Sequence, residues 1–236
     1  MLGGLRVWFY GLSKKLTKRF FHDKGKNNRI VLVGRNGQEK SAKPKDLRNI
    51  KIKFTGDNNL LKIHLPCDLR CSCFAFRCNN SVIEIGGYSH VTFDIDCIAD
   101  ESGVFVGEHC YCGGAEMVCC GNKIEIGNNC MFSNEILFLD DTHSILSYKN
   151  NRVLNKNKPV LKIGNHVWIG KKVTLLKNAS VPDDCIVGYG SLVTKKILEE
   201  HTILAGSPAR IVKTGITWHS LNPQSYTPQK AKGMPV

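Results

Sequence analysis

The sequence predicts an all-β protein, a parallel β-helix built from hexapeptide repeats. From Ile163 onward, an aliphatic residue returns at every sixth position and is often followed by small or turn-forming residues. An amphipathic helix requires apolar spacings of three and four, and a half-buried strand requires a spacing of two. A period of six instead indicates short strands joined by corners, which bury their aliphatic side chains only when successive coils stack. The repeated positions are Ile163, Ile169, Leu175, Val181, Val187 and Val193.

The same spacing occurs earlier in the chain, with slips in phase between blocks. These slips predict extra residues at the corners. We expect the β-helix to span residues 61–204, between an N-terminal extension (1–60) and a C-terminal segment (205–236). The earlier blocks are Ile63, Leu69 and Ala75; Ile85, Val91 and Cys97; Val106, Cys112 and Val118; and Ile126, Phe132 and Phe138.

The N-terminal extension is basic and partly apolar, and it predicts a short α/β unit. Residues 1–30 carry eight Lys or Arg residues and one acid, interleaved with Leu, Phe and Trp. This pattern resembles a basic amphipathic helix on an anionic membrane surface, although a helix packed on the first coil or on a neighbouring subunit would give the same pattern. The run Ile30–Val33 predicts a strand. No apolar run approaches membrane-spanning length.

Net charge and cysteine content indicate which classes of partner and which cellular compartment fit this chain. A net charge of +13 is compatible with nucleic-acid binding, but no basic motif interleaved with aromatic residues is found, so we expect no nucleic-acid partner. Eleven cysteines in a chain of this length, without a recognisable signal peptide, indicate small, reduced, buried residues of a cytoplasmic protein. Cys71-Ser72-Cys73 and Cys119-Cys120 lack the paired spacing of a zinc site, and no metal is expected.

The repeat stops between Phe138 and Ile163, which predicts a projecting loop over residues 139–160. A long excursion from a regular repeat is usually functional or disordered. The loop carries His143 in the run D-D-T-H-S, and an imidazole can accept a proton near neutral pH. Asp141 is the candidate to orient this histidine, with Glu135 or a residue of another subunit as alternatives. A histidine in a polar surface loop without a catalytic role would look the same in sequence.

Two further features lie on the last coils. Trp168 stands before a small-residue corner, where it would pack outward or form an apolar wall for a substrate. His166, two residues earlier, is expected on the same face, at the surface or at an interface. Lys195, Arg210 and Lys213 suit phosphate groups, or form a solvated basic face. The chain lacks a Walker-type loop and a dinucleotide-binding glycine fingerprint.

Four motifs taken together resemble the hexapeptide-repeat acetyltransferases. They are I-G-N-N-C-M-F-S followed by D-D-T-H-S-I, then I-G-N-H-V-W-I-G, V-G-Y-G-S-L-V-T-K and A-G-S-P-A-R-I-V-K, in this order over roughly residues 80–215. Within the family, the chain is most similar to sugar O-acetyltransferases of bacterial surface-polysaccharide synthesis, of capsule or lipopolysaccharide. The resemblance implies a left-handed β-helix, a homotrimer with active sites between adjacent subunits, and acetyl-CoA as the donor.

The resemblance also implies roles for individual residues. His143 matches the general base of the loop motif, and Trp168 matches the tryptophan that lines the site. Lys171 matches the position beside the pantetheine arm of the donor. The remaining donor-side positions are Tyr189, Thr194, Lys195, Ala205, Gly206, Pro208, Arg210 and Lys213.

The sequence thus predicts an acetyl-CoA-dependent O-acetyltransferase that acts on a hydroxyl of a sugar, a glycan or a lipid-linked glycan, in the cytoplasm or at the inner face of the membrane. An N-acetyltransferase of an amino sugar or sugar nucleotide would use the same scaffold. A β-helical zinc carbonic anhydrase would need three histidine ligands, and His109, His143 and His166 lack the close pair of such a site. A non-catalytic β-helix scaffold is the last alternative, which the presence of His143 disfavours.

Overall fold

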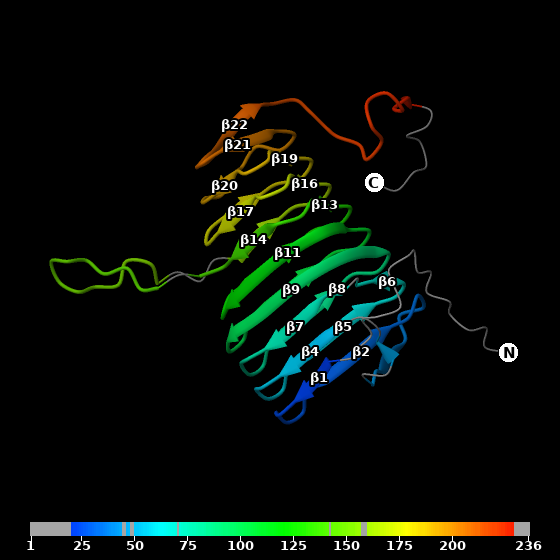
Figure 1. Cartoon of the computed structure of the whole chain (residues 1–236). Helices are drawn as coiled ribbons and strands as arrows, with labels where there is room; N and C mark the ends of the chain where they lie inside the picture. The colour runs from blue at the N-terminus through cyan, green and yellow to red at the C-terminus, as the bar shows by residue number, and fades with distance from the viewer. Residues whose placement is uncertain are drawn as a thin grey trace.

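The computed structural model describes residues 20–43, 46–47, 50–69, 71–141, 143–156 and 160–228, and every named element in them is a β-strand. The strands form a column of stacked coils, from β1 (Phe20–Asp23) at one end to β22 (Ala209–Lys213) at the other (Figure 1). None of the described residues forms a helix long and apolar enough to cross a bilayer.

One face of the column, called face A, is a sheet of eight strands. All neighbouring pairs in this sheet are parallel except β2 and β3, which form an antiparallel pair at its N-terminal end. In spatial order the strands are β3 (Glu39–Ser41), β2 (Arg29–Val33), β5 (Leu60–His64), β8 (Val82–Ile85), β10 (Gly103–Val106), β12 (Lys123–Ile126), β15 (Val160–Ile163) and β18 (Ser180–Val181).

The second sheet covers the two remaining faces, B and C. Its long strands β9 (Ser89–Ala99) and β11 (Tyr111–Cys120) pair with strands of both faces. Face B also holds β6 (Cys67–Asp68), β13 (Met131–Phe132), β16 (Trp168–Ile169), β19 (Ile186–Val187), β21 (Ile203–Gly206) and β22. Face C holds β1, β4 (Lys51–Phe54), β7 (Cys73–Phe76), β14 (Ile136–Leu139), β17 (Thr174–Leu176) and β20 (Leu192–Val193).

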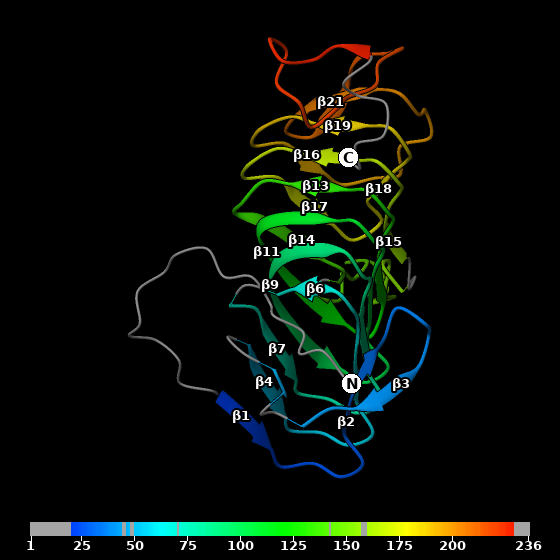
Figure 2. The same ribbon diagram turned by 90° about the vertical axis from the view of Figure 1, so that its right-hand side faces the viewer.

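Three corners join these faces in every full coil, because the chain passes from face A to face B, then to face C, and back to face A. After a quarter turn of the molecule, β15 and β18 of face A lie to one side of β13, β16 and β19 of face B (Figure 2). Residues that follow strands of one face therefore stack in a column along one corner, which is how residues distant in sequence come together.

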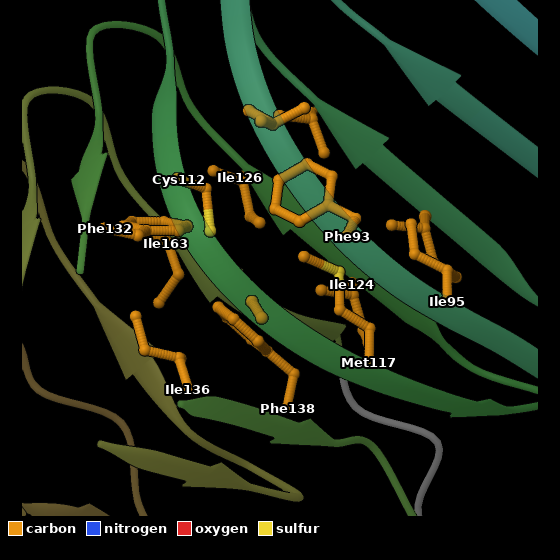
Figure 3. Close-up of a cluster of buried hydrophobic side chains, with 14 of the residues drawn as sticks. Phe93, Ile95, Cys112, Met117, Ile124, Ile126, Phe132, Ile136, Phe138 and Ile163 are labelled. Atoms are coloured by element: carbon orange, nitrogen blue, oxygen red, sulfur yellow. The ribbon is translucent and has the colours of Figure 1, made fainter. Parts of the chain in front are cut away.

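The hexapeptide positions point into the column, as the sequence predicts. The six positions from Ile163 to Val193 are each at most 1% exposed. The predicted inward positions of the earlier blocks are buried as well, with two exceptions. Val118 is partly exposed, and Ala75, although only 8% exposed, lies on the outer side of β7 between the core residues Phe74 and Phe76. The central part of this core combines aromatic and aliphatic side chains of all three faces, as Phe132 of face B, Phe138 of face C and Ile124 of face A illustrate (Figure 3).

The prediction for Val118 is wrong by one residue. A bulge between Cys112 and Ala115 inserts an extra residue into β11 relative to β9. This shift turns Met117 and Cys119 into the core, where both are fully buried, and leaves Val118 partly exposed. Bulges of this kind re-aim the side chains that follow them.

The cysteines within the repeats serve as small core residues. The predicted burial of the cysteines is confirmed for Cys97, Cys112, Cys130 and Cys185, which are each at most 2% exposed, whereas Cys71 is exposed. All eleven cysteines are free. Burial raises the pKa of the Cys112 thiol to about 12, so this thiol stays protonated at neutral pH.

The β-helix begins earlier than residue 61. Strands β1 and β2 pair in parallel with β4 and β5, which brings residues 20–60 into the sheets of the column. The strand predicted at Ile30–Val33 is confirmed by β2. The candidate amphipathic helix lies mostly in residues 1–19, outside the described residues, and its described end is strand rather than helix. There the Phe21 ring lies edge-on to Phe54, at 6.3 Å between ring centroids, so pairing and aromatic packing continue the core.

The corner between faces A and B is one of the tight parts of the fold. A Cβ atom added to Gly86 would lie 2.3 Å from the carbonyl oxygen of Gly107, and one added to Gly127 would lie 2.6 Å from that of Gly164. Only glycine fits where neighbouring coils approach this closely. At Gly87, by contrast, the nearest atoms would lie 3.7 Å away, which is ordinary contact.

This contrast gives a matched test of the stacking. We expect Gly86→Ala to lower the free energy of unfolding by about 1–3 kcal/mol, because the new methyl group must push two backbones apart. Gly87→Ala should change it by less than about 1 kcal/mol. Urea titrations of the two variants measure the difference, and equal midpoints would show that coil spacing does not limit stability at this corner.

Candidate active site

The projecting loop leaves the column at the corner between faces C and A, after β14 (Figure 1). Asp140 anchors its root and is fully buried. The Asp140 carboxylate accepts hydrogen bonds from the backbone N–H of Cys120 at 2.7 Å and from the Cys119 thiol at 3.0 Å. Burial raises the pKa of Asp140, and the hydrogen bonds oppose this shift in part. Asp140 thus holds the loop in place and does not face a substrate.

Asp141 forms an ion pair with Lys177 of the next coil, at 2.6 Å between Nζ and Oδ1. The same ammonium group donates to the backbone carbonyl of Asn155, at 3.2 Å, on the returning arm of the loop. Lys177 therefore ties both arms of the loop to the column. Its side chain is only 10% exposed, which makes the pair stronger than a surface ion pair.

His143 lies just beyond this anchor, and its side chain is exposed. The Asn155 side chain fixes the backbone on both sides of it, accepting from Ile145 N–H at 2.8 Å and donating to the His143 carbonyl at 2.9 Å. Farther out, the two arms pair through an antiparallel bridge between Leu146 and Val153. The loop is thus an ordered hairpin that presents an imidazole to the outside.

Trp168 points outward from β16 and is 39% exposed. Beside it, Trp218 of the C-terminal segment stacks on His166 at 4.4 Å and lies 6.1 Å from the Trp168 ring. The Trp218 indole N–H donates to the His166 carbonyl at 2.8 Å. Trp218 is only 8% exposed, so this contact fastens the C-terminal segment to the column.

The expectation for His166 needs correction. Its Nδ1 lies 2.6 Å from the Asp184 carboxylate, and its ring lies beneath Trp218. The side chain is 19% exposed, so it is partly covered by the chain's own C-terminal segment instead of standing free at a surface or interface. Trp218 was missed by sequence reasoning because it lies outside the repeat, where no periodicity assigns it a face.

Lys171 and Tyr189 occupy the corner between faces B and C on successive coils, since the N–H of Gly190 donates to the Lys171 carbonyl at 2.9 Å. Lys171 pairs with Glu135 of the coil below, at 2.7 Å. This contact raises the pKa of Lys171 and lowers that of Glu135. Glu135 therefore lies at the Lys171 corner and not beside the root of the His143 loop.

The remaining donor-side residues lie at the top of the column but at different corners. Gly206 ends β21 and Arg210 lies near the start of β22, on either side of the turn above the Tyr189 corner. Thr194 and Lys195 follow β20, at the corner that carries the loop. Lys213 ends β22 beside Ile203, near the corner between faces A and B. The chain brings Lys171, Tyr189, Gly206 and Arg210 together at one corner. It leaves Thr194, Lys195 and Lys213 apart from them.

His143 and the Lys171 corner stand at opposite edges of face C. Five residue steps separate Glu135 at one edge from Asp140 at the other, which is about 16 Å along an extended strand. The described residues contain no group of three or more His, Cys, Asp or Glu side chains placed to hold a metal ion.

Comparison with known proteins places this geometry in a family. No family model matches the chain. The chain is 30% identical over 185 residues to an uncharacterized 24.8 kDa protein in the cps region of Klebsiella pneumoniae, a match that covers 73% of the chain and 77% of that protein. It is 33% identical over 97 residues to a polysialic acid O-acetyltransferase of Neisseria meningitidis. That match covers 41% of the chain and 45% of the relative, so the chain spans about half the length of this curated relative.

The structural match extends over nearly the whole column. The crystal structure of the polySia-specific acetyltransferase NeuO superposes with a TM-score of 0.75 and 26% identity, over 88% of this chain and 92% of that one. The chain belongs to the hexapeptide-repeat acetyltransferases. The predicted left-handed parallel β-helix of this acetyltransferase family is thereby confirmed.

The anchoring of the projecting loop can be tested without a substrate. We expect Lys177→Gln to speed amide hydrogen exchange across residues 143–156, because a partly buried carboxylate loses its counter-charge and both arms lose a shared donor. Lys172→Gln, which removes a more exposed lysine beside Glu135, serves as the control. Unchanged exchange in the Lys177 variant would mean that the hairpin's own contacts suffice to order it.

Proposed function

We propose that this protein transfers the acetyl group of acetyl-CoA to a hydroxyl of a sugar, in the synthesis of a bacterial surface polysaccharide. The observation that carries the proposal is His143, an exposed imidazole on an anchored hairpin of an acetyltransferase fold. The relatives that are named as O-acetyltransferases support an O-acetyl transfer. An uncharacterized relative whose description places it in a cps region supports a polysaccharide acceptor.

In the proposed reaction, His143 takes the hydroxyl proton as the acceptor oxygen attacks the thioester carbonyl carbon. The tetrahedral intermediate carries a negative charge on oxygen, which backbone N–H groups at a corner would stabilise. The carbon–sulfur bond then breaks, and the imidazolium returns the proton to the thiolate of coenzyme A. No covalent enzyme intermediate is required, because holding both substrates in one cleft supplies much of the rate.

The donor would lie along the corner between faces B and C. Trp168 and Tyr189 offer aromatic walls there, and Lys171 lies between them along the coil. Gly206 and Arg210 lie above, where the guanidinium would meet a phosphate group. Thr194, Lys195 and Lys213 stand at other corners of the same protomer, so they would contact this donor only from a neighbouring subunit.

The same separation supports a homotrimer. In a closed threefold ring every subunit presents the same two surfaces, so the His143 hairpin of one subunit can meet the Lys171 corner of the next. The acceptor would be a free, polymeric or lipid-linked glycan. We place the reaction in the cytoplasm, with residues 1–30 as a candidate contact to the inner membrane surface.

Removal of the proposed base is the first test. His143→Ala should lower the turnover number by about 100- to 10,000-fold, while light scattering still gives about three times the chain mass. His90→Ala, an exposed histidine of β9, is the control and should keep its activity. Near-normal turnover of the His143 variant with its best acceptor would exclude this histidine as the base.

Subunit mixing is the second test. We expect trimers that combine His143→Ala chains with Arg210→Glu chains to regain part of the activity that each parent lacks, because one boundary then pairs an intact base with an intact donor corner. Recovery is measured by coenzyme A release after co-refolding at varied ratios. A mixture with no activity beyond that of its parents would place base and donor residues on the same subunit.

A further inference from the structure

A pocket of about 440 Å³ opens on the B–C corner directly below Lys171. The pair Gly113-Gly114, at the bulge of β11, leaves this corner without side chains, and a Cβ at Gly114 would meet its nearest neighbour only at 3.7 Å. Thr92 lines the pocket from the coil below, and Glu135 lines it from the coil above. The hollow therefore exists because two glycines replace the side chains that would fill it.

The pocket is continuous with the proposed donor site. Glu135 at its upper rim contacts Lys171 at 2.7 Å, and the backbone N–H of Lys172 donates to the Asn134 carbonyl at 3.2 Å. A donor arm that runs down this corner past Lys171 would thus end at the mouth of the pocket. A second substrate in the pocket would face the end of that arm.

The charged groups that line the pocket are all acidic. They are Asp94, Glu116 and Glu135, and none of the described residues lining it is Lys or Arg, although the chain carries a net charge of +13. Asp94 and Glu116 are partners in neighbouring parallel strands, so their Cα atoms are about 5 Å apart. Lys171 balances the charge of Glu135, while Asp94 and Glu116 add further negative charge to the pocket. Leu137, next in the same row, adds an apolar wall.

We propose that this pocket binds the acceptor and that its carboxylates select a neutral hexose or N-acetylhexosamine residue over an acidic sugar. This inference rests on the proposed function. Carboxylates form strong, charge-assisted hydrogen bonds with hydroxyl groups, and an apolar wall suits the C–H face of a sugar ring. The carboxylate of an acidic sugar would instead meet two like charges at close range. The acceptor would thus differ from the polysialic acid in the names of two relatives.

The test compares acceptors and charge variants of the full chain. Lactose and diacetylchitobiose are the neutral probes, and a sialic acid oligomer is the acidic probe. Coenzyme A release gives kcat/KM, and saturation-transfer NMR gives binding without turnover. Glu116→Lys changes the pocket, and Glu108→Lys makes the same change at an exposed site on the A–B corner. Melting curves confirm that both variants fold.

We expect the wild-type protein to prefer a neutral probe, and Glu116→Lys to lower kcat/KM for that probe by about tenfold or more through loss of charge-assisted hydrogen bonds. For Glu116→Lys, the KM for acetyl-CoA should change less than about twofold. For Glu108→Lys, kcat/KM for the neutral probe should also change less than about twofold. Preference for the sialic acid oligomer, or an unchanged Glu116→Lys protein, would overturn the inference and leave the acetyl transfer standing. Neutral probes that bind to the wild type and to Glu108→Lys, but not to Glu116→Lys, would uphold the pocket even if acetyl transfer failed. A wild type that binds neither neutral probe would refute it.

Discussion

Backbone hydrogen bonds between successive coils are the constraint on which the rest of this structure depends. At the A–B corner the N–H groups of Gly86, Gly107, Gly127 and Gly164 each donate to the coil above at 2.8–2.9 Å. At these four positions a Cβ would lie 2.2–2.6 Å from the next coil, so only glycine fits there. Asn128 and Asn165 reinforce the same corner. The backbone N–H of Asn128 donates to the Asn165 side chain, and the backbone N–H of Asn165 donates to the Asp183 side chain. An antiparallel strand covers one edge strand at each end of the column, β3 on β2 and β22 on β21, which limits open strand edges.

In the coils of the candidate site, the other two corners relax this constraint in different ways, and the site uses both. At the B–C corner, Gly113 and Gly114 add a residue to the coil and open a hollow. At the C–A corner, the chain leaves the column altogether and returns as the His143 hairpin, which Asp140 and Lys177 hold at its root. Irregular segments on a rigid scaffold are the usual place for binding and catalysis. Here the regular corner supplies stability, and the two irregular ones supply chemistry.

The repeat made most of the column predictable, and the failures have physical causes. The positions from Ile163 to Val193 obey a strict period because each coil there has the same length. The prediction for Val118 fails because a bulge adds one residue to β11 and reverses the sides to which its later side chains point. Phe20–Asp23 lies within the basic, partly apolar stretch that predicts an amphipathic helix, yet it pairs with β4 and forms a strand. The Asp141–Lys177 pair and the Trp218–His166 stack join residues that are 36 and 52 positions apart. Such contacts depend on which corner a residue occupies, and that is known only once the coils are counted.

The loop itself indicates what must lie opposite it. Ile145, Leu146 and Leu154 are each at least 50% exposed, and Tyr148 is 90% exposed. A soluble surface rarely leaves such apolar side chains together in water, because their burial is worth about 25 cal/mol per Å². Within one protomer the hairpin points away from the column and finds no surface of the described residues to cover it (Figure 1). In the proposed trimer it would lie against the next subunit, where the exposed Tyr189 and Trp168 offer apolar area near the Lys171 corner. The same contact that buries the hairpin would bring His143 to the donor, so that assembly and completion of the site become one event.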